Sequence, residues 1–64
     1  MNEIKESVLN TIRNIMDSMN IAEDNWYVTP ANGEYVRVKY WTKGCYWITE
    51  YYLIRDGKVI DCQF

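Results

Sequence analysis

The side chains best able to do chemistry in this chain are two carboxylates and two thiols. Glu50 and Asp61 are predicted to lie on one face of neighbouring strands, where a carboxylate pair can carry out acid–base chemistry. Arg37 is predicted to lie opposite Glu50, which favours a salt bridge instead. Cys45 follows a glycine and is expected to be exposed, and Cys62 is expected to be a small core residue. Because the chain has no histidine to activate either thiol, we expect a protein that is not an enzyme.

Metal ions, cofactors and small-molecule substrates are not expected either. Histidine, the commonest metal ligand and general base, is missing, and an open sheet offers no cleft that would exclude water. Two cysteines are too few for a disulfide scaffold, so we expect reduced thiols. The first ten residues carry acidic side chains where a signal peptide is basic, and no stretch is apolar enough for a membrane span. These features predict a cytoplasmic protein with no membrane association.

The composition predicts that apolar surface is left over after folding. The chain has 64 residues, of which 48% are hydrophobic and 16% aromatic. A single domain of this size, residues 1–64, buries only about 60% of the surface that its unfolded chain exposes. Part of the apolar area must therefore stay at the surface or meet a partner. The net charge of −2 argues against a general polyanion binder, so nucleic acid is not the favoured partner.

One helix and four strands must position these side chains. Apolar residues spaced by three and four predict an amphipathic helix, with a stripe made of Ile4, Val8, Ile12, Ile15, Met16 and Met19. Asn2 is predicted to cap this helix, and Asn20 to end it in the left-handed conformation. The turn pairs Asn32-Gly33, Lys43-Gly44 and Asp56-Gly57 then separate segments rich in Val, Ile, Thr, Tyr and Trp. We assign strands near residues 26–29, 34–42, 45–55 and 58–63.

Consecutive hairpins predict an α+β fold, with the N-terminal amphipathic helix packed on a four-stranded antiparallel β-meander. Two-residue loops would pair Tyr40 with Trp47 and Tyr51 with Cys62. The face predicted to meet the helix comprises Tyr27, Val36, Val38, Tyr40, Trp47, Thr49, Tyr51, Leu53, Ile60, Cys62 and Phe64. A bulge at Gly44 would break this register.

The opposite face of the sheet is predicted to be aromatic and uncovered. Its candidate binding residues are Trp26, Tyr35, Arg37, Lys39, Trp41, Tyr46, Ile48, Glu50 and Tyr52. In this register Arg37 can pair with Glu50, and Lys39 lies near Trp41 at a distance that permits a cation–π contact. Aromatic side chains and arginine are enriched at protein-interface hot spots.

Several explanations of this aromatic face remain open. The rings can simply shield the sheet by pairing across strands. They can form a protein interface, either with a different protein or in a homodimer, and this is the explanation that we favour. They can also serve as a stacking platform for single-stranded nucleic acid, with Arg37, Lys39 and Lys43 holding phosphates. Mimicry of DNA by the acidic helix ranks below the sheet interface.

Two resemblances add to this interpretation. The stretch YYLIRDGKVIDCQF, residues 51–64, resembles the closing hairpin of nuclear-transport-factor-like cone folds, and it implies a shared hairpin but no functional residue. The whole chain, which is small, acidic and aromatic-rich, resembles phage-encoded inhibitors, including anti-CRISPR proteins, in build only. That resemblance implies an inhibitor or regulator of a larger macromolecular machine.

Overall fold

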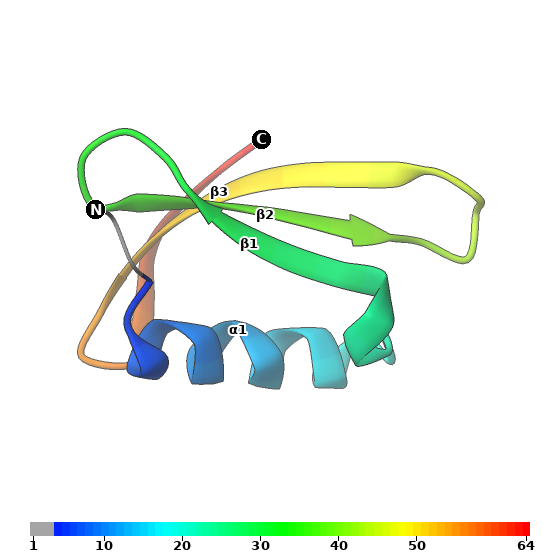
Figure 1. The fold of residues 1–64 in the computed structure, drawn as a ribbon, viewed down its shortest axis with the longest axis horizontal. Helices are drawn as coiled ribbons and strands as arrows, with labels where there is room; N and C mark the ends of the chain where they lie inside the picture. Colours follow the sequence, from blue (N-terminus) through cyan, green and yellow to red (C-terminus); the bar gives the residue numbers. More distant parts are fainter. Residues whose placement is uncertain (1–3) are drawn as a thin grey trace.

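A computed structural model describes residues 4–64 and confirms the α+β fold (Figure 1). Its elements are the helix α1 (Glu6–Ser18), a short 3-10 helix η1 (Glu23–Asn25), and the strands β1 (Trp26–Pro30), β2 (Tyr35–Trp41), β3 (Trp47–Arg55) and β4 (Lys58–Gln63). The strands form one antiparallel sheet in the order β1-β2-β3-β4, which is the predicted meander. Within residues 4–64 no helix is long and apolar enough to cross a bilayer.

The helix ends where the sequence predicted. Asn20 has a φ of 59°, in the left-handed region. Its N–H donates to the carbonyl of Asp17, and the N–H of Ile21 donates to that of Met16, both at 3.0 Å. These bonds help to satisfy the carbonyls of the last helical turn. The predicted cap Asn2 lies outside the described residues, and the helix begins after Lys5 without a side-chain cap.

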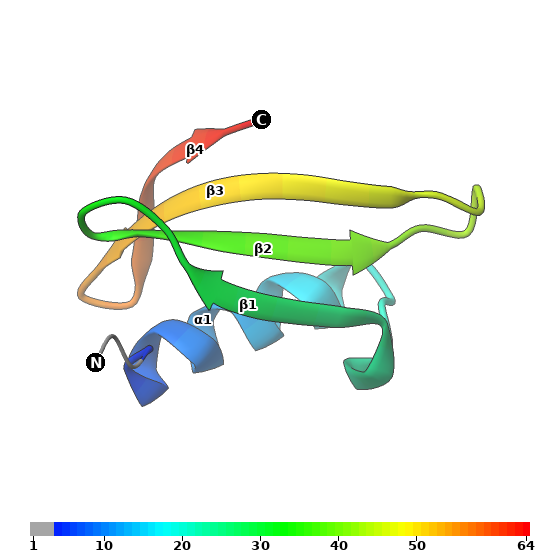
Figure 2. The same ribbon diagram turned by 45° about the horizontal axis from the view of Figure 1, so that its top comes forward.

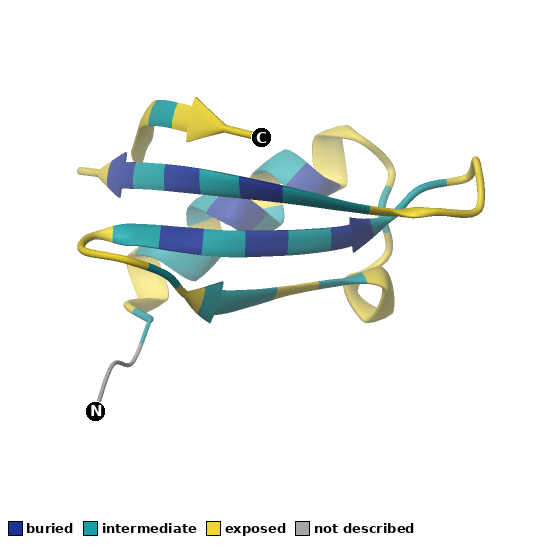
Figure 3. Ribbon diagram, turned by 90° about the horizontal axis from the view of Figure 1, so that it is seen from above, coloured by how far each residue is buried: buried dark blue, intermediate teal, exposed yellow. Residues whose placement is uncertain are grey.

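The helix covers one face of the sheet, and the core lies between them (Figures 1 and 2). Ile12 and Met16 of α1 are fully buried there, as is Val38 of β2. Along β2 and β3 buried and partly buried residues alternate, as expected for strands with one covered face (Figure 3). In the part of the chain that the structure describes, no element lies over the other face, which we call the open face.

The β2–β3 hairpin turns through one residue more than the sequence predicted. Thr42 pairs with Tyr46 instead of Cys45, and its N–H donates to the Tyr46 carbonyl at 3.0 Å. The loop is therefore Lys43-Gly44-Cys45, and Cys45 takes the positive φ of 66° that a two-residue loop would have given to glycine. Gly44 lies close to the exposed Tyr46 ring, which would have to move if residue 44 carried a Cβ, because that atom would lie 2.7 Å from it.

This extra loop residue reverses every side chain of β3 relative to the prediction. Tyr40 pairs with Ile48 rather than Trp47. Glu50 and Tyr52, which were predicted on the open face, point toward the helix and are 9% and 5% exposed. Trp47, predicted under the helix, is on the open face instead. The cause is geometric, since a one-residue shift moves an entire strand to the opposite face.

The strand β1 is reversed in the same way. The N–H of Ala31 donates to the Tyr35 carbonyl at 3.0 Å, so the first hairpin loop also holds three residues, 32–34. Trp26 consequently pairs with Tyr40 and packs against the core, although it was predicted on the open face. Tyr27, predicted to face the helix, is exposed on the open side instead.

The last hairpin follows the prediction only near its turn. Asp56 and Gly57 have φ values of 52° and 74°, as a two-residue Asp-Gly loop requires. The register then shifts between Leu53 and Ile54 of β3, where β4 carries an extra residue. This bulge brings Asp61 opposite Leu53 on the open face and Cys62 opposite Tyr52. Cys62 is nevertheless exposed, so the prediction of a core cysteine is wrong.

Candidate interaction face

The register brings a defined set of side chains to the open face. They alternate along the four strands and are Tyr27, Thr29, Tyr35, Arg37, Lys39, Trp41, Trp47, Thr49, Tyr51, Leu53, Asp61 and Gln63. Of the candidates predicted from sequence, four lie here: Tyr35, Arg37, Lys39 and Trp41. Four others, Trp26, Ile48, Glu50 and Tyr52, lie on the helix side. Tyr46 lies at the hairpin tip and is 57% exposed.

Three open-face rings contact one another and form what we call the ring cluster: Tyr27, Trp41 and Trp47. The ring centroids of Tyr27 and Trp47 are 5.9 Å apart and those of Trp41 and Trp47 are 5.5 Å apart, both in edge-to-face geometry. Tyr27 is 47% and Trp47 is 49% exposed. The cluster lies toward the end of the sheet where the β2–β3 hairpin projects beyond α1 (Figure 1). It therefore presents aromatic area to solvent on a fixed platform.

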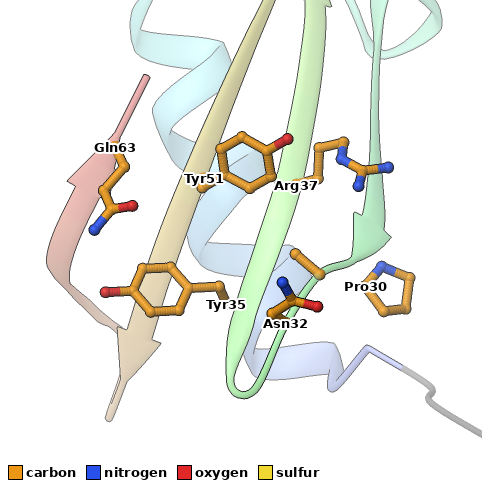
Figure 4. A pocket seen from close by; sticks show the side chains of 7 residues that line it. Pro30, Asn32, Tyr35, Arg37, Tyr51 and Gln63 are labelled. Carbon is orange, nitrogen blue, oxygen red and sulfur yellow. The ribbon is translucent and has the colours of Figure 1, made fainter.

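A second feature of the open face is a hollow beside Arg37. We call it the Arg37 hollow, and it is lined by Pro30, Ala31, Asn32, Tyr35, Arg37, Tyr51 and Gln63 (Figure 4). Its volume is about 570 Å³. The guanidinium carbon of Arg37 lies 5.7 Å from the centroid of the Tyr51 ring, its cross-strand neighbour. This cation–π contact replaces the predicted pairing of Arg37 with Glu50.

Within residues 4–64, Asp61 is the one acid on the open face, and its carboxylate is already hydrogen-bonded. Asp61 accepts a hydrogen bond from the hydroxyl of Tyr35 and another, at 3.2 Å, from Nε2 of Gln63. The hydrogen bond to Asp61 raises the pKa of Tyr35, with burial and the charge of Asp61 adding to it. Arg37 is left without such a partner: the ion pairs in residues 4–64 are Arg13 with Glu23 and Arg55 with Glu34.

The helix side holds a separate polar group. The Tyr52 hydroxyl donates to Oε1 of Glu50 at 2.5 Å. Burial, followed by this hydrogen bond and the charge of Glu50, raises the pKa of Tyr52, and burial and the same charge raise that of Tyr40. Partial desolvation and the charge of Glu50 also raise the pKa of Cys62, which keeps its thiol protonated and weakly nucleophilic.

The predicted carboxylate pair does not form. Glu50 faces the helix and Asp61 faces the open side, so the two acids are separated by the sheet. Cys45 is exposed, as predicted. Across residues 4–64, no group of three or more Cys, Asp or Glu side chains is arranged to hold a metal ion.

The sequence missed Tyr27, Trp47 and Tyr51 as open-face residues for a physical reason. Both sets of alternating side chains in residues 47–55 are largely apolar, so hydrophobic alternation does not choose between the two registers. The charge of Glu50 favoured the wrong register, because a charged side chain is expected on the uncovered face. No signal in the strand itself could have corrected this, because the register is set by loop length.

Comparison with protein-family models, with curated proteins and with solved structures finds no match to this chain. A function for this chain is therefore inferred from its open face.

Proposed function

We propose that this chain is a non-enzymatic module that binds another protein through its open face. The observation that carries the proposal is the ring cluster of Tyr27, Trp41 and Trp47, in which Tyr27 and Trp47 are about half exposed and Trp41 is partly buried. Edge-to-face contacts hold these rings in place, so little side-chain entropy is lost when a partner covers them. Tyrosine and tryptophan held in this way are the residue types that dominate binding energy at protein interfaces.

The most concrete version of this function is an inhibitor or regulator of a larger macromolecular machine. A chain of 64 residues that uses one sheet face for contact can act by occupying a surface on its target. We propose that it works in the reducing environment of the cytoplasm, which is supported by its free cysteines, Cys45 and Cys62.

Matched variants test the proposal. Trp47→Ala removes the central ring of the cluster, whereas Asn14→Ala alters an exposed residue of α1 on the other side of the molecule. Immobilised wild-type protein and both variants are compared for the proteins that they retain from the native host. We expect the retained partner to be lost with Trp47→Ala and kept with Asn14→Ala. Equal retention by both variants contradicts docking through the ring cluster.

A homodimer is the other protein partner to be tested. Sedimentation of the pure protein across a range of concentrations measures self-association directly. A mass that doubles with concentration in the wild type, and stays monomeric in Trp47→Ala, would identify a second copy as the partner. A constant monomer mass leaves the face for a different protein.

A second candidate function, binding of single-stranded nucleic acid, is favoured by one observation. The observed register turns Glu50 away from the open face and leaves Arg37 and Lys39 beside the rings. Bases can stack on such rings while cations hold the phosphates. This function predicts that oligonucleotides quench tryptophan fluorescence and that the quenching fades steeply with salt. No quenching at low salt would contradict it.

A further inference from the structure

The Arg37 hollow combines an unpaired cation with a shaped, partly polar surface. Within residues 4–64, neither ion pair involves Arg37, whose guanidinium lies against the Tyr51 ring. In Figure 4 the Arg37 side chain extends from β2 away from Tyr51 and toward β1, with Asn32 and Pro30 below it on the side of the β1–β2 loop. Because no side-chain hydrogen bond or ion pair within residues 4–64 involves the guanidinium, its N–H groups are available to an acceptor.

We propose that the Arg37 hollow binds a carboxylate of an acidic side chain on the protein partner. A guanidinium presents parallel N–H groups that match the two oxygens of a carboxylate. The proposal rests on the proposed function, because it specifies the chemistry of the partner at a second place on the same face.

The charges around the hollow favour a carboxylate over a phosphate. Among the described residues that line the hollow, Arg37 is the one cation. Asp61 lies at its β4 side, where it holds the Tyr35 hydroxyl and the Gln63 amide. A dianionic phosphate would meet one cation and one nearby acid, whereas a monoanionic carboxylate is matched by the single guanidinium.

The position of the hollow relative to the ring cluster sets the spacing of the partner's contacts. Arg37 and Trp41 lie on the same face of β2, four residues apart, which corresponds to about 13 Å along a strand. An extended segment places its residues i and i+4 on one side at the same separation. The partner segment is therefore expected to carry an acidic residue in the hollow and an apolar residue on the rings.

Two capped peptides test this inference without knowledge of the natural partner. The probe is Glu-Ser-Ser-Ser-Leu, and the matched peptide has Gln in place of Glu. Binding to isotope-labelled protein is followed by nuclear magnetic resonance at the Arg37 Nε–H and the Asn32 side-chain amide. We expect the Glu peptide to shift both signals saturably, with a dissociation constant about tenfold lower than that of the Gln peptide.

Variants then distinguish binding by the Arg37 guanidinium from attraction to positive charge in general. Arg37→Gln should make the two peptides bind about equally, so that the ratio of their dissociation constants (Gln peptide to Glu peptide) is about one. Arg37→Lys should leave a ratio of only about two. Lys39→Gln removes a cation that lies on the same face but outside the hollow. In this variant the Glu peptide should still bind several times more tightly than the Gln peptide. Equal binding of the two peptides by the wild type would overturn the proposal. Tighter binding of inorganic phosphate than of the Glu peptide would also overturn it, in favour of nucleic acid.

The same titration distinguishes failure of the hollow from failure of the ring cluster. Trp47→Ala should weaken the binding of both peptides by a similar factor, because it removes the contact with their leucine. The ratio of the two dissociation constants should therefore stay the same. A preserved ratio with no effect of Trp47→Ala would support the hollow and contradict docking on the rings.

Discussion

A tyrosine hydroxyl donates to a carboxylate on each face of this sheet, but the two pairs lie in different surroundings. On the helix side Tyr52 donates to Glu50, and both side chains are buried. On the open side Tyr35 donates to Asp61, and both are partly exposed. Burial is the largest cause of the raised pKa of Tyr52, whereas the hydrogen bond is the largest cause for Tyr35. The same contact is therefore structural on one face and replaceable by water on the other.

This difference extends to the apolar residues of the two faces. Met16 and Trp47 are both large, but Met16 is fully buried under the sheet and Trp47 is half exposed on it. We expect Met16→Ala to lower the free energy of unfolding by about 3 kcal/mol, because it opens a cavity in a small core. Trp47→Ala should cost less, about 2 kcal/mol, because half of the ring is already exposed and only the covered half and its edge-to-face contacts are lost. Urea unfolding measures both, and equal losses would contradict the division into a core face and a docking face.

The tyrosine pairs give the next largest contrast. Tyr52→Phe removes the Tyr52 donor from the buried Glu50 carboxylate and should lower the free energy of unfolding by about 2 kcal/mol. Tyr35→Phe should leave stability almost unchanged, because water can replace the lost donor to Asp61. The two variants remove the same atom, so each serves as the control of the other. A larger loss in Tyr35→Phe would reverse the assignment of the buried pair.

High pH should weaken the packing on the helix side of the sheet. The pKa of Tyr52 is raised above its ordinary value of 10.0, so the folded state holds the phenol proton more tightly than the unfolded state. The resulting stabilisation is complete below pH 10 and is lost as the pH rises above that value toward the folded-state pKa. Alkaline unfolding followed by circular dichroism should therefore be less steep in Tyr52→Phe. A stability that stays constant from pH 9 to about pH 12 would contradict this.

The smallest effect is expected at Thr29 on the open face. Its Oγ1 is buried and, within residues 4–64, has no hydrogen-bond partner. Thr29→Val keeps the branched shape and removes the unpaired hydroxyl, so it should be neutral or stabilise the fold by up to about 1 kcal/mol. Thermal unfolding measures the difference. A clear loss of stability would mean that the hydroxyl has a partner in solution.

Much of the fold was predictable from local patterns. The apolar stripe predicted that Ile12 and Met16 would be buried, and Asn20 ends the helix as its tolerance of positive φ suggested. Alternation along β2 correctly assigned Val36 and Val38 to the core. These features depend on residues close together in sequence, which is why a single chain is enough to predict them.

The candidate site was less predictable, because face assignment depends on loop length. Asn32-Gly33 and Lys43-Gly44 both suggested two-residue loops, but each loop takes in one more residue. At the second loop the left-handed position falls on Cys45, and Gly44 makes room for the Tyr46 ring. Each added loop residue exchanges the two faces of the neighbouring strand, β1 or β3, relative to the prediction. Of the candidates within strands, only those on β2 therefore stayed on the open face.

The register between β2 and β3 decides which side chains reach the open face, and one nuclear Overhauser measurement tests it directly. Because Thr42 and Tyr46 form a hydrogen-bonded pair, Lys39 and Thr49 form a non-hydrogen-bonded pair, whose Cα atoms approach to about 4.5 Å. We expect a strong signal between the Hα atoms of Lys39 and Thr49. A strong signal from the Hα of Lys39 to that of Ile48 instead would return Glu50 and Tyr52 to the open face and contradict both proposed binding features.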